Sequence, residues 1–378
     1  MFSSTFSYIK YSVLTVVFAL CLSFNAQAEH EETHATTAET HTEDASKAHE
    51  EKFDAGKMIM EHILDAHDWH LWGDHKNPVS IPLPIILYTD KGLDVFMSSA
   101  FHHGEATVNG KYDYKLNHGH IEVVNGAGEK DEAATAAIKD FSITKNVAAL
   151  FISIILLLFI FLPIAKKYKA NPNSAPSGLQ SLLEPIILFI QDNVAIPNIG
   201  KKKYEKYMPF LLTVFFFILI NNLMGLIPFF PGGANLTGNI SVTLTLSAIV
   251  LIIVIVTSNK HYWQHILAMP GVPKPVLLIL TPIEILGFVI RPFVLMMRLF
   301  ANITAGHIVI LSFISLIFIF GSMSAAAGYG VSIFSMLLVV FMSLLELLVA
   351  FLQAYVFTLL SAIYFGSAIE EGHHEEHH

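Results

Sequence analysis

The sequence predicts an all-α integral membrane protein with about five membrane helices, two of them long and tilted, one interfacial helix and a small extracytoplasmic extension at the N-terminus. Of its 378 residues, 53% are hydrophobic and 14% are charged, with a mean hydropathy of +0.56. An average soluble protein is about a quarter charged, so this composition excludes a water-soluble enzyme. Residues 29–142 hold 22 acids and 9 lysines, whereas residues 143–378 hold 9 acids and 12 basic residues. An overall acidic chain is also a poor ligand for nucleic acid.

The first 28 residues are predicted to be a signal peptide. Lys10 precedes an apolar run over residues 11–24, and Ala26-Gln27-Ala28 has the small-x-small form of a cleavage site. An uncleaved membrane anchor is the alternative. Residues 29–52 are rich in glutamate and histidine and are predicted to be a disordered tail, because they contain too little apolar surface to bury. The single cysteine, Cys21, excludes a disulfide framework and a cysteine metal site.

Residues 53–142 are predicted to form a small folded domain, mixed in structure and rich in turns. Trp69, Trp72 and the apolar run over residues 81–88 could supply a core. Histidines gather here with loose spacing, whereas a closed zinc site needs fixed spacing. We therefore interpret them as solvated side chains or a weak metal or proton buffer and assign no metal, with a specific zinc site as the alternative. These histidines are His67, His70, His75, His102, His103, His118 and His120.

Three crossings of ordinary length are predicted next. Each is an uncharged or nearly uncharged run of about the length that spans 30 Å of hydrocarbon. Lysines follow the first crossing and precede the second, which places these ends in the cytoplasm and the extension outside. The crossings are Val147–Ala165, Met208–Phe230 and Asn239–Thr257, and the amphipathic segment Gly178–Ile196 is predicted to lie on the cytoplasmic surface.

Two longer apolar stretches end the membrane half. Val276–Phe320 and Val331–Gly366 are joined by residues 321–330, which are predicted to form a turn rich in Gly, Ala and Ser. A helix of 45 residues would be about 68 Å long, roughly twice the hydrocarbon thickness. Such helices must tilt, kink or break, and Pro282 and Pro292 are the predicted kinks. Residues 371–378 form a short tail of His and Glu.

The only two arginines of the chain, Arg291 and Arg298, lie inside the first long stretch. Arginine keeps its charge at membrane depth, at a cost of about 2.5–3.5 kcal/mol, so it indicates function by default. On a continuous helix, Asn302 shares a face with Arg298, and His307 points to the opposite side. Further polar groups are Glu284, Glu346 and Gln353. The alternative is that Arg298 only neutralises Glu284 or Glu346 in a buried ion pair.

At these residues the sequence resembles subunit a of the rotary F-type ATP synthase. The segment from Arg298 to His307 (RLFANITAGH) is similar to the signature of this family, and Tyr207–Pro228 resembles its first hairpin span. Pro282-Ile-Glu284 and Arg291-Pro292 precede the signature at the spacing of the family. The resemblance covers residues 143–370, the expected membrane domain, and assigns no role to residues 29–142.

The resemblance implies a non-catalytic ion-channel subunit rather than an enzyme acting alone. Two tilted helices would pack against the ring of c-subunits, with Arg298 facing the ring carboxylates between two aqueous half-channels. It implies further that protons pass the outer half-channel at Asn302, His307, Glu346 and Gln353 and the cytoplasmic one at Glu284, with Arg291 secondary. The implied partners are the c-ring, the b-subunit stator, the rest of the synthase, lipid and protons, in a bacterial inner membrane with the C-terminus cytoplasmic. No cofactor is implied, and no phosphate-binding GxxxxGK[ST] loop occurs in the sequence.

Two other classes of function remain open. A proton-coupled secondary transporter or metal exporter would use the same buried ions and the external histidines, but it should show a substrate site between internal repeats, and no repeat is evident. An adhesion or assembly protein anchored by these spans would not need a buried arginine. Copurification with a ring of small hairpins and a nucleotide-binding head would distinguish these classes.

Overall fold

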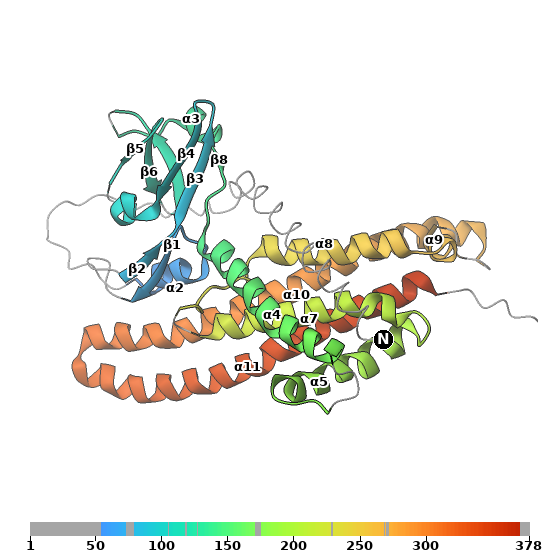
Figure 1. Cartoon of the computed structure of the whole chain (residues 1–378). Coiled ribbons are helices and arrows are strands. Elements are labelled where there is room, and N and C mark those ends of the chain that lie inside the picture. The colour runs from blue at the N-terminus through green and yellow to red at the C-terminus, as the bar shows by residue number, and fades with distance from the viewer. Residues whose placement is uncertain are drawn as a thin grey trace, which may run out of the picture.

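The chain forms a bundle of long helices with a smaller domain of short strands beside it (Figure 1). The predicted signal peptide, the tail over residues 29–52 and the C-terminal tail lie outside the described residues. A computed structural model describes residues 54–72, 79–104, 106–117, 119–126, 128–170, 175–227, 230–267, 269 and 272–370.

The extension is built from three small antiparallel sheets, with strand orders β1-β2, β4-β3-β8 and β5-β6-β7. Its strands are β1 (Asp68–Trp72), β2 (Val79–Pro82), β3 (Pro84–Thr89), β4 (Gly92–Met97), β5 (Val108–Asn109), β6 (Asp113–Asn117), β7 (His120–Val124) and β8 (Lys139–Asp140). Its helices are α2 (Ala55–Ile63), the 3-10 helix η2 (Ser98–Gly104) and α3 (Glu132–Ala136).

Alternation of side chains explains why strands form here. In β3, Ile85 and Leu87 are fully buried, whereas the neighbouring Tyr88 is exposed. This alternation is the two-residue period of a half-buried strand. Phe101 and Tyr114 complete the same core. The all-α prediction therefore holds only for the membrane half, because the extension buries its apolar residues on strand faces.

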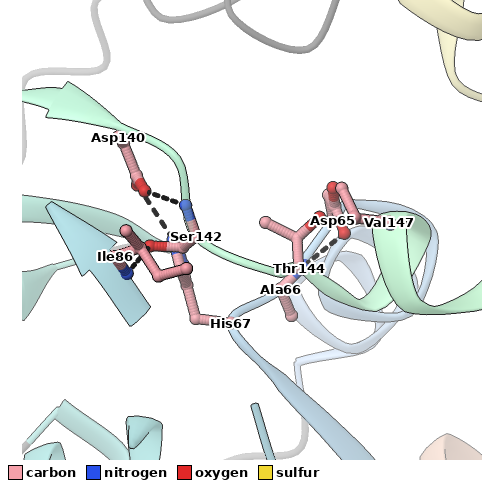
Figure 2. A network of polar contacts seen from close by, with 8 residues as sticks. All are labelled: Asp65, Ala66, His67, Ile86, Asp140, Ser142, Thr144 and Val147. Carbon is pink, nitrogen blue, oxygen red and sulfur yellow. Dashed lines mark hydrogen bonds and ion pairs between the residues drawn. The ribbon is translucent and has the colours of Figure 1, made fainter. Parts of the chain in front are cut away.

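A polar network ties residues 140–142, just before the first membrane helix, to the rest of the extension (Figure 2). His67 Nε2 lies 3.1 Å from Asp140 Oδ2, and the Ser142 amide donates to Asp140 Oδ1 at 2.8 Å. The Ser142 hydroxyl oxygen in turn accepts a hydrogen bond from the amide of Ile86. Burial alone would raise the pKa of Asp140, but hydrogen bonds from His67 and Ser142 outweigh it and lower that pKa below its ordinary value. His67 is thus a buried structural residue rather than a solvated one.

Helices occupy the three predicted crossings of ordinary length: α4 (Lys145–Ala170), α7 (Tyr204–Leu226) and α8 (Ile240–Thr257). The most enclosed is α7, which packs against α4 and α11 and contributes Leu211, Phe215 and Ile218 to the centre of the core. Its burial from all sides explains why it is apolar around its whole circumference.

The amphipathic segment forms one helical run, α5 (Leu179–Ile190), a π-helical turn η3 (Gln191–Ala195) and α6 (Ile196–Ile199). By length and composition, six helices in the described ranges could cross a membrane, and this run has the lowest mean hydropathy of the six, 1.2. Its placement on the cytoplasmic surface stays a prediction. The short helix α9 (Lys260–Leu267) was not predicted.

The two long stretches form an antiparallel hairpin of α10 (Lys274–Met323) and α11 (Ala325–Ile369). Both Pro282 and Pro292 lie within the single helical element α10. The chain reverses within the predicted turn over residues 321–330, but the turn is shorter than predicted: only Ser324 interrupts the helices, and its hydroxyl accepts from the amide of Ala327 as the N-cap of α11. The small residues instead allow close contact, since a Cβ at Gly328 would lie 2.8 Å from Gly321 Cα.

Candidate functional site

Arg298 lies on the outward face of α10. Its side chain is exposed, as is that of Asn302 one turn later, while Leu295 and Leu299 are buried against the bundle. Among the residues that the structure describes, none forms an ion pair with Arg298, so neither Glu284 nor Glu346 neutralises it. Ala301 beside it is small and exposed, which leaves room for a helix of another chain to approach the guanidinium closely.

Arg291 differs from Arg298 although both belong to α10. It is half-buried, and its Nη1 donates to the Tyr262 hydroxyl of α9 at 3.4 Å. Its guanidinium carbon lies 6.0 Å from the centre of the Tyr364 ring of α11. The guanidinium of Arg291 therefore makes contacts within the chain, between three helices. Of the two arginines, only Arg298 presents its charge outward.

His307 of α10 and Glu346 of α11 lie at neighbouring positions, where α10 meets α11 and α7. Gly306 has no side chain, and the Glu346 carboxylate fills the place that a Cβ at this position would take. His307 follows at once in the sequence, and a Cβ on Gly225 of α7 would lie 3.6 Å from His307 Nε2. Both side chains are half-buried. Two titratable groups on facing helices thus lie at the level of adjacent residues of α10, Gly306 and His307.

Polar side chains that the sequence reasoning had not assigned lie beside this pair. Asn222 of α7 donates from Nδ2 to the carbonyl oxygen of Ala350 at 3.1 Å, and its Oδ1 accepts from the Thr237 hydroxyl at 2.7 Å. Ala350 lies one turn after Glu346 in α11, and the buried Gln353 follows it. The sequence feature that could have indicated these groups is the pair of asparagines at 221 and 222 inside an apolar span. Side-chain amides at membrane depth are costly unless they have hydrogen-bond partners.

Glu284 lies on the other side of Arg298 along α10. It is half-buried and close enough to Tyr262 for its charge to act there. At 1.5 Å per residue, Glu284 is about 21 Å before Arg298 and His307 about 14 Å after it. The single outward charge therefore separates two titratable sites that are not continuous with each other along the helix.

No metal centre emerges from the histidines. Within the described ranges, no group of three His, Cys, Asp or Glu side chains is close enough to hold a metal ion. His75 and His118 lie outside the described residues, and His67 is bonded to Asp140. His70, His102 and His120 are exposed.

Comparisons with known proteins find matches to both the membrane half and the extension. Residues 147–366 match the family model described as ATP synthase A chain, and residues 58–141 match one described as Domain of unknown function (DUF8433). A Chlorobaculum tepidum protein named ATP synthase subunit a 2 is 47% identical over 61% of this chain and 64% of its own length. Two proteins named ATP synthase subunit a are similar: one from Chlorobium phaeobacteroides (45% identical over 63% of this chain, 69% of its own length) and one from Myxococcus xanthus (39%, 66% and 80%).

The family match covers more than half of the chain and contains every polar group of the site, from Asn222 to Gln353. The resemblance inferred from the segment Arg298–His307 is therefore confirmed. The chain belongs to the ATP synthase A chain family, and it is a proton-translocating, non-catalytic membrane subunit of that synthase.

Proposed function

We propose that this subunit forms two separate half-channels that meet a ring of c-subunits on either side of Arg298. The observation that carries the proposal is the outward, unpaired charge of Arg298 among the described residues, with titratable sites before and after it on α10. A permanent cation is costly beside lipid, and a ring carboxylate is the partner that would offset this cost.

The outer half-channel runs past His307 and Glu346, with Asn302 and Gln353 along the same path. A proton from outside binds His307, passes to the Glu346 carboxylate and then neutralises a carboxylate of the ring. The neutral carboxylate can face lipid as the ring turns. Histidine suits this relay because its ordinary pKa lies near neutrality, and the approach of Glu346 to Gly306, the residue before His307, supports a transfer between the two groups.

The cytoplasmic half-channel contains Glu284 and releases the proton after nearly a full turn of the ring. Arg298 keeps the passing carboxylate ionised at this point, and no proton crosses directly between the two half-channels. Because one charge moving through 100 mV yields only about 2.3 kcal/mol, several protons drive each ATP formed elsewhere in the complex. The stator b-subunit would hold this chain still against the ring.

Replacing His307 by alanine tests the outer half-channel. We expect passive proton conduction through the head-stripped membrane sector and ATP-driven pumping both to fall to background, while the subunit stays assembled with the ring. The reason is that the alanine leaves no titratable nitrogen beside Glu346. Conduction at the unaltered rate in a fully assembled complex would contradict this half-channel.

The orientation that we propose places the extension outside a bacterial inner membrane and the C-terminus in the cytoplasm. It follows from the lysines at 166–169 and 201–206. A tag inserted within residues 36–46 should be cut by protease added to spheroplasts whose inner membrane is intact, and a tag after His378 should be protected. The reverse result would overturn the orientation.

A further inference from the structure

The helix α2 of the extension lies against the membrane domain near His307. It packs on α10, between the small sheets and the bundle (Figure 1). His62, close to its C-terminal end, is exposed to solvent, and His307 is near enough for the charges of the two histidines to interact. A titratable side chain outside the ATP synthase match, at residue 62, thus lies beside the outer site.

Lys145 holds this part of the chain in place. It is buried at the start of α4, and its Nζ donates to the carbonyl oxygen of His62 at 3.3 Å. Its amide donates to the carbonyl oxygen of Ala66 at 2.8 Å, and Asp65 Oδ1 accepts from the amide of Asn146 at 3.0 Å. Residues 62–66 are therefore fixed to the outer end of α4, and His62 cannot drift away from α10 without breaking these bonds.

Crowding by the surrounding protein, together with nearby charges, keeps His62 neutral at ordinary external pH. Crowding by surrounding protein is the largest cause, followed by the charges of Lys145, His307 and His70, and together they lower the pKa of His62 to about 4. Asp65 and Asp68 face Lys145 from the same segment and partly balance it. Because the ring stays accessible to water, a neutral imidazole nitrogen is available at the surface to accept a proton and release it again.

We propose that α2 forms the entrance of the outer half-channel and that His62 exchanges protons between external water and His307. The inference rests on the outer half-channel proposed above and adds a group from the extension to it. In each transfer, hydronium or external buffer gives a proton to a His62 imidazole nitrogen, which forms an N–H bond. That bond breaks when the proton passes through water to His307, so His62 returns to its neutral form.

The first test measures passive conduction in proteoliposomes that hold the whole membrane sector. In the His62→Ala variant, we expect proton uptake driven by a potassium diffusion potential to fall about tenfold in weak buffer, less than the 10²–10⁴ of a fully positioned catalytic proton transfer. Imidazole added outside should restore it, which a purely structural role would not predict. His102→Asn is the control: it replaces another exposed histidine of the extension, at a positive φ of 43° that asparagine tolerates.

A second test does not depend on the loss of a side chain. In a Cys21→Ala background, His62→Cys is treated from outside with a positively charged, membrane-impermeant thiol reagent, and we expect conduction to fall after labelling. Met60→Cys is the matched control, because Met60 is 52% exposed on α2 but lies about 200° around the helix from residue 62. Labelling it should leave conduction unchanged.

The two proposals fail in different ways. If His62→Ala conducts at the unaltered rate and labelled His62→Cys does too, while His307→Ala does not conduct, the entrance at α2 is wrong and the half-channel stands. If His307→Ala itself conducts normally, the half-channel is wrong. Equal loss after labelling at residues 62 and 60 would show that any added bulk on α2 disturbs the subunit, and would also overturn the role of His62.

Discussion

Arg298→Ala is expected to abolish ATP-driven proton pumping and ATP synthesis while leaving the subunit inserted and assembled with the ring. Without a permanent cation at this point, a ring carboxylate can pass between the two half-channels still protonated. Membranes stripped of the nucleotide-binding head should then leak protons passively. Assembly, passive leak and driven pumping are measured on the same vesicles.

Two lysine variants separate the charge from its geometry. Arg298→Lys should also fail, with less leak, because a lysine is a point charge whose pKa falls on burial. Arg291→Lys should be tolerated far better, since Arg291 makes one hydrogen bond at 3.4 Å and a ring contact within the chain. Under the ion-pair alternative, Arg298→Ala combined with Glu284→Gln or Glu346→Gln would restore pumping. Such restoration would overturn the barrier role of Arg298.

Gly306→Val is expected to stop driven pumping, as Arg298→Ala does, but to lower the passive proton leak rather than raise it. Its side chain would occupy the place of the Glu346 carboxylate and force it away from the outer path. Because the outer path is blocked while Arg298 is unchanged, passive conduction through the stripped membranes should fall below the unaltered rate, whereas those of Arg298→Ala leak. The readouts are driven pumping and passive conduction in the same preparation.

Gly330→Val is the control for this substitution. Gly330 belongs to α11, and no described atom lies within 4 Å of a Cβ built there, so the same valine meets open space. It should pump at the unaltered rate. Normal pumping by an assembled Gly306→Val subunit would show that the position of Glu346 beside Gly306 does not matter for the proton path.

The membrane helices were predictable because an uncharged run in a bilayer has few alternatives. The crossing expected at Asn239–Thr257 is the helix Ile240–Thr257, and the start expected at Val276 lies two residues from the observed Lys274. Arg298 could also be singled out from the sequence, since a permanent charge at membrane depth is rare and costly. Features of this kind can be predicted because they depend only on the residues of one short segment.

Features that depend on contacts between distant segments were harder to predict. Glycine and alanine near residue 321 indicate a turn or close helix packing equally well, and only the contact between Gly321 and Gly328 decides. The bond from Asn222 to Ala350 joins residues 128 positions apart. In the extension, strands of two to six residues are too short to show a clear alternation of apolar and polar residues, so the sheets could not be predicted. The approach of His62 to His307 joins distant segments and does not follow from the sequence either.

The length of α10 also determines how far the subunit extends sideways in the membrane. Its 50 residues measure about 75 Å, so keeping both ends within about 30–45 Å of bilayer requires an angle of about 55–65° from the membrane normal. The lateral reach is then about 60–70 Å, several times the 8–10 Å that separates packed helices. A round ring touches so long a helix over only a short length, and Arg298 lies at the middle of α10. The two ends of the hairpin are therefore left to lipid or to stationary subunits.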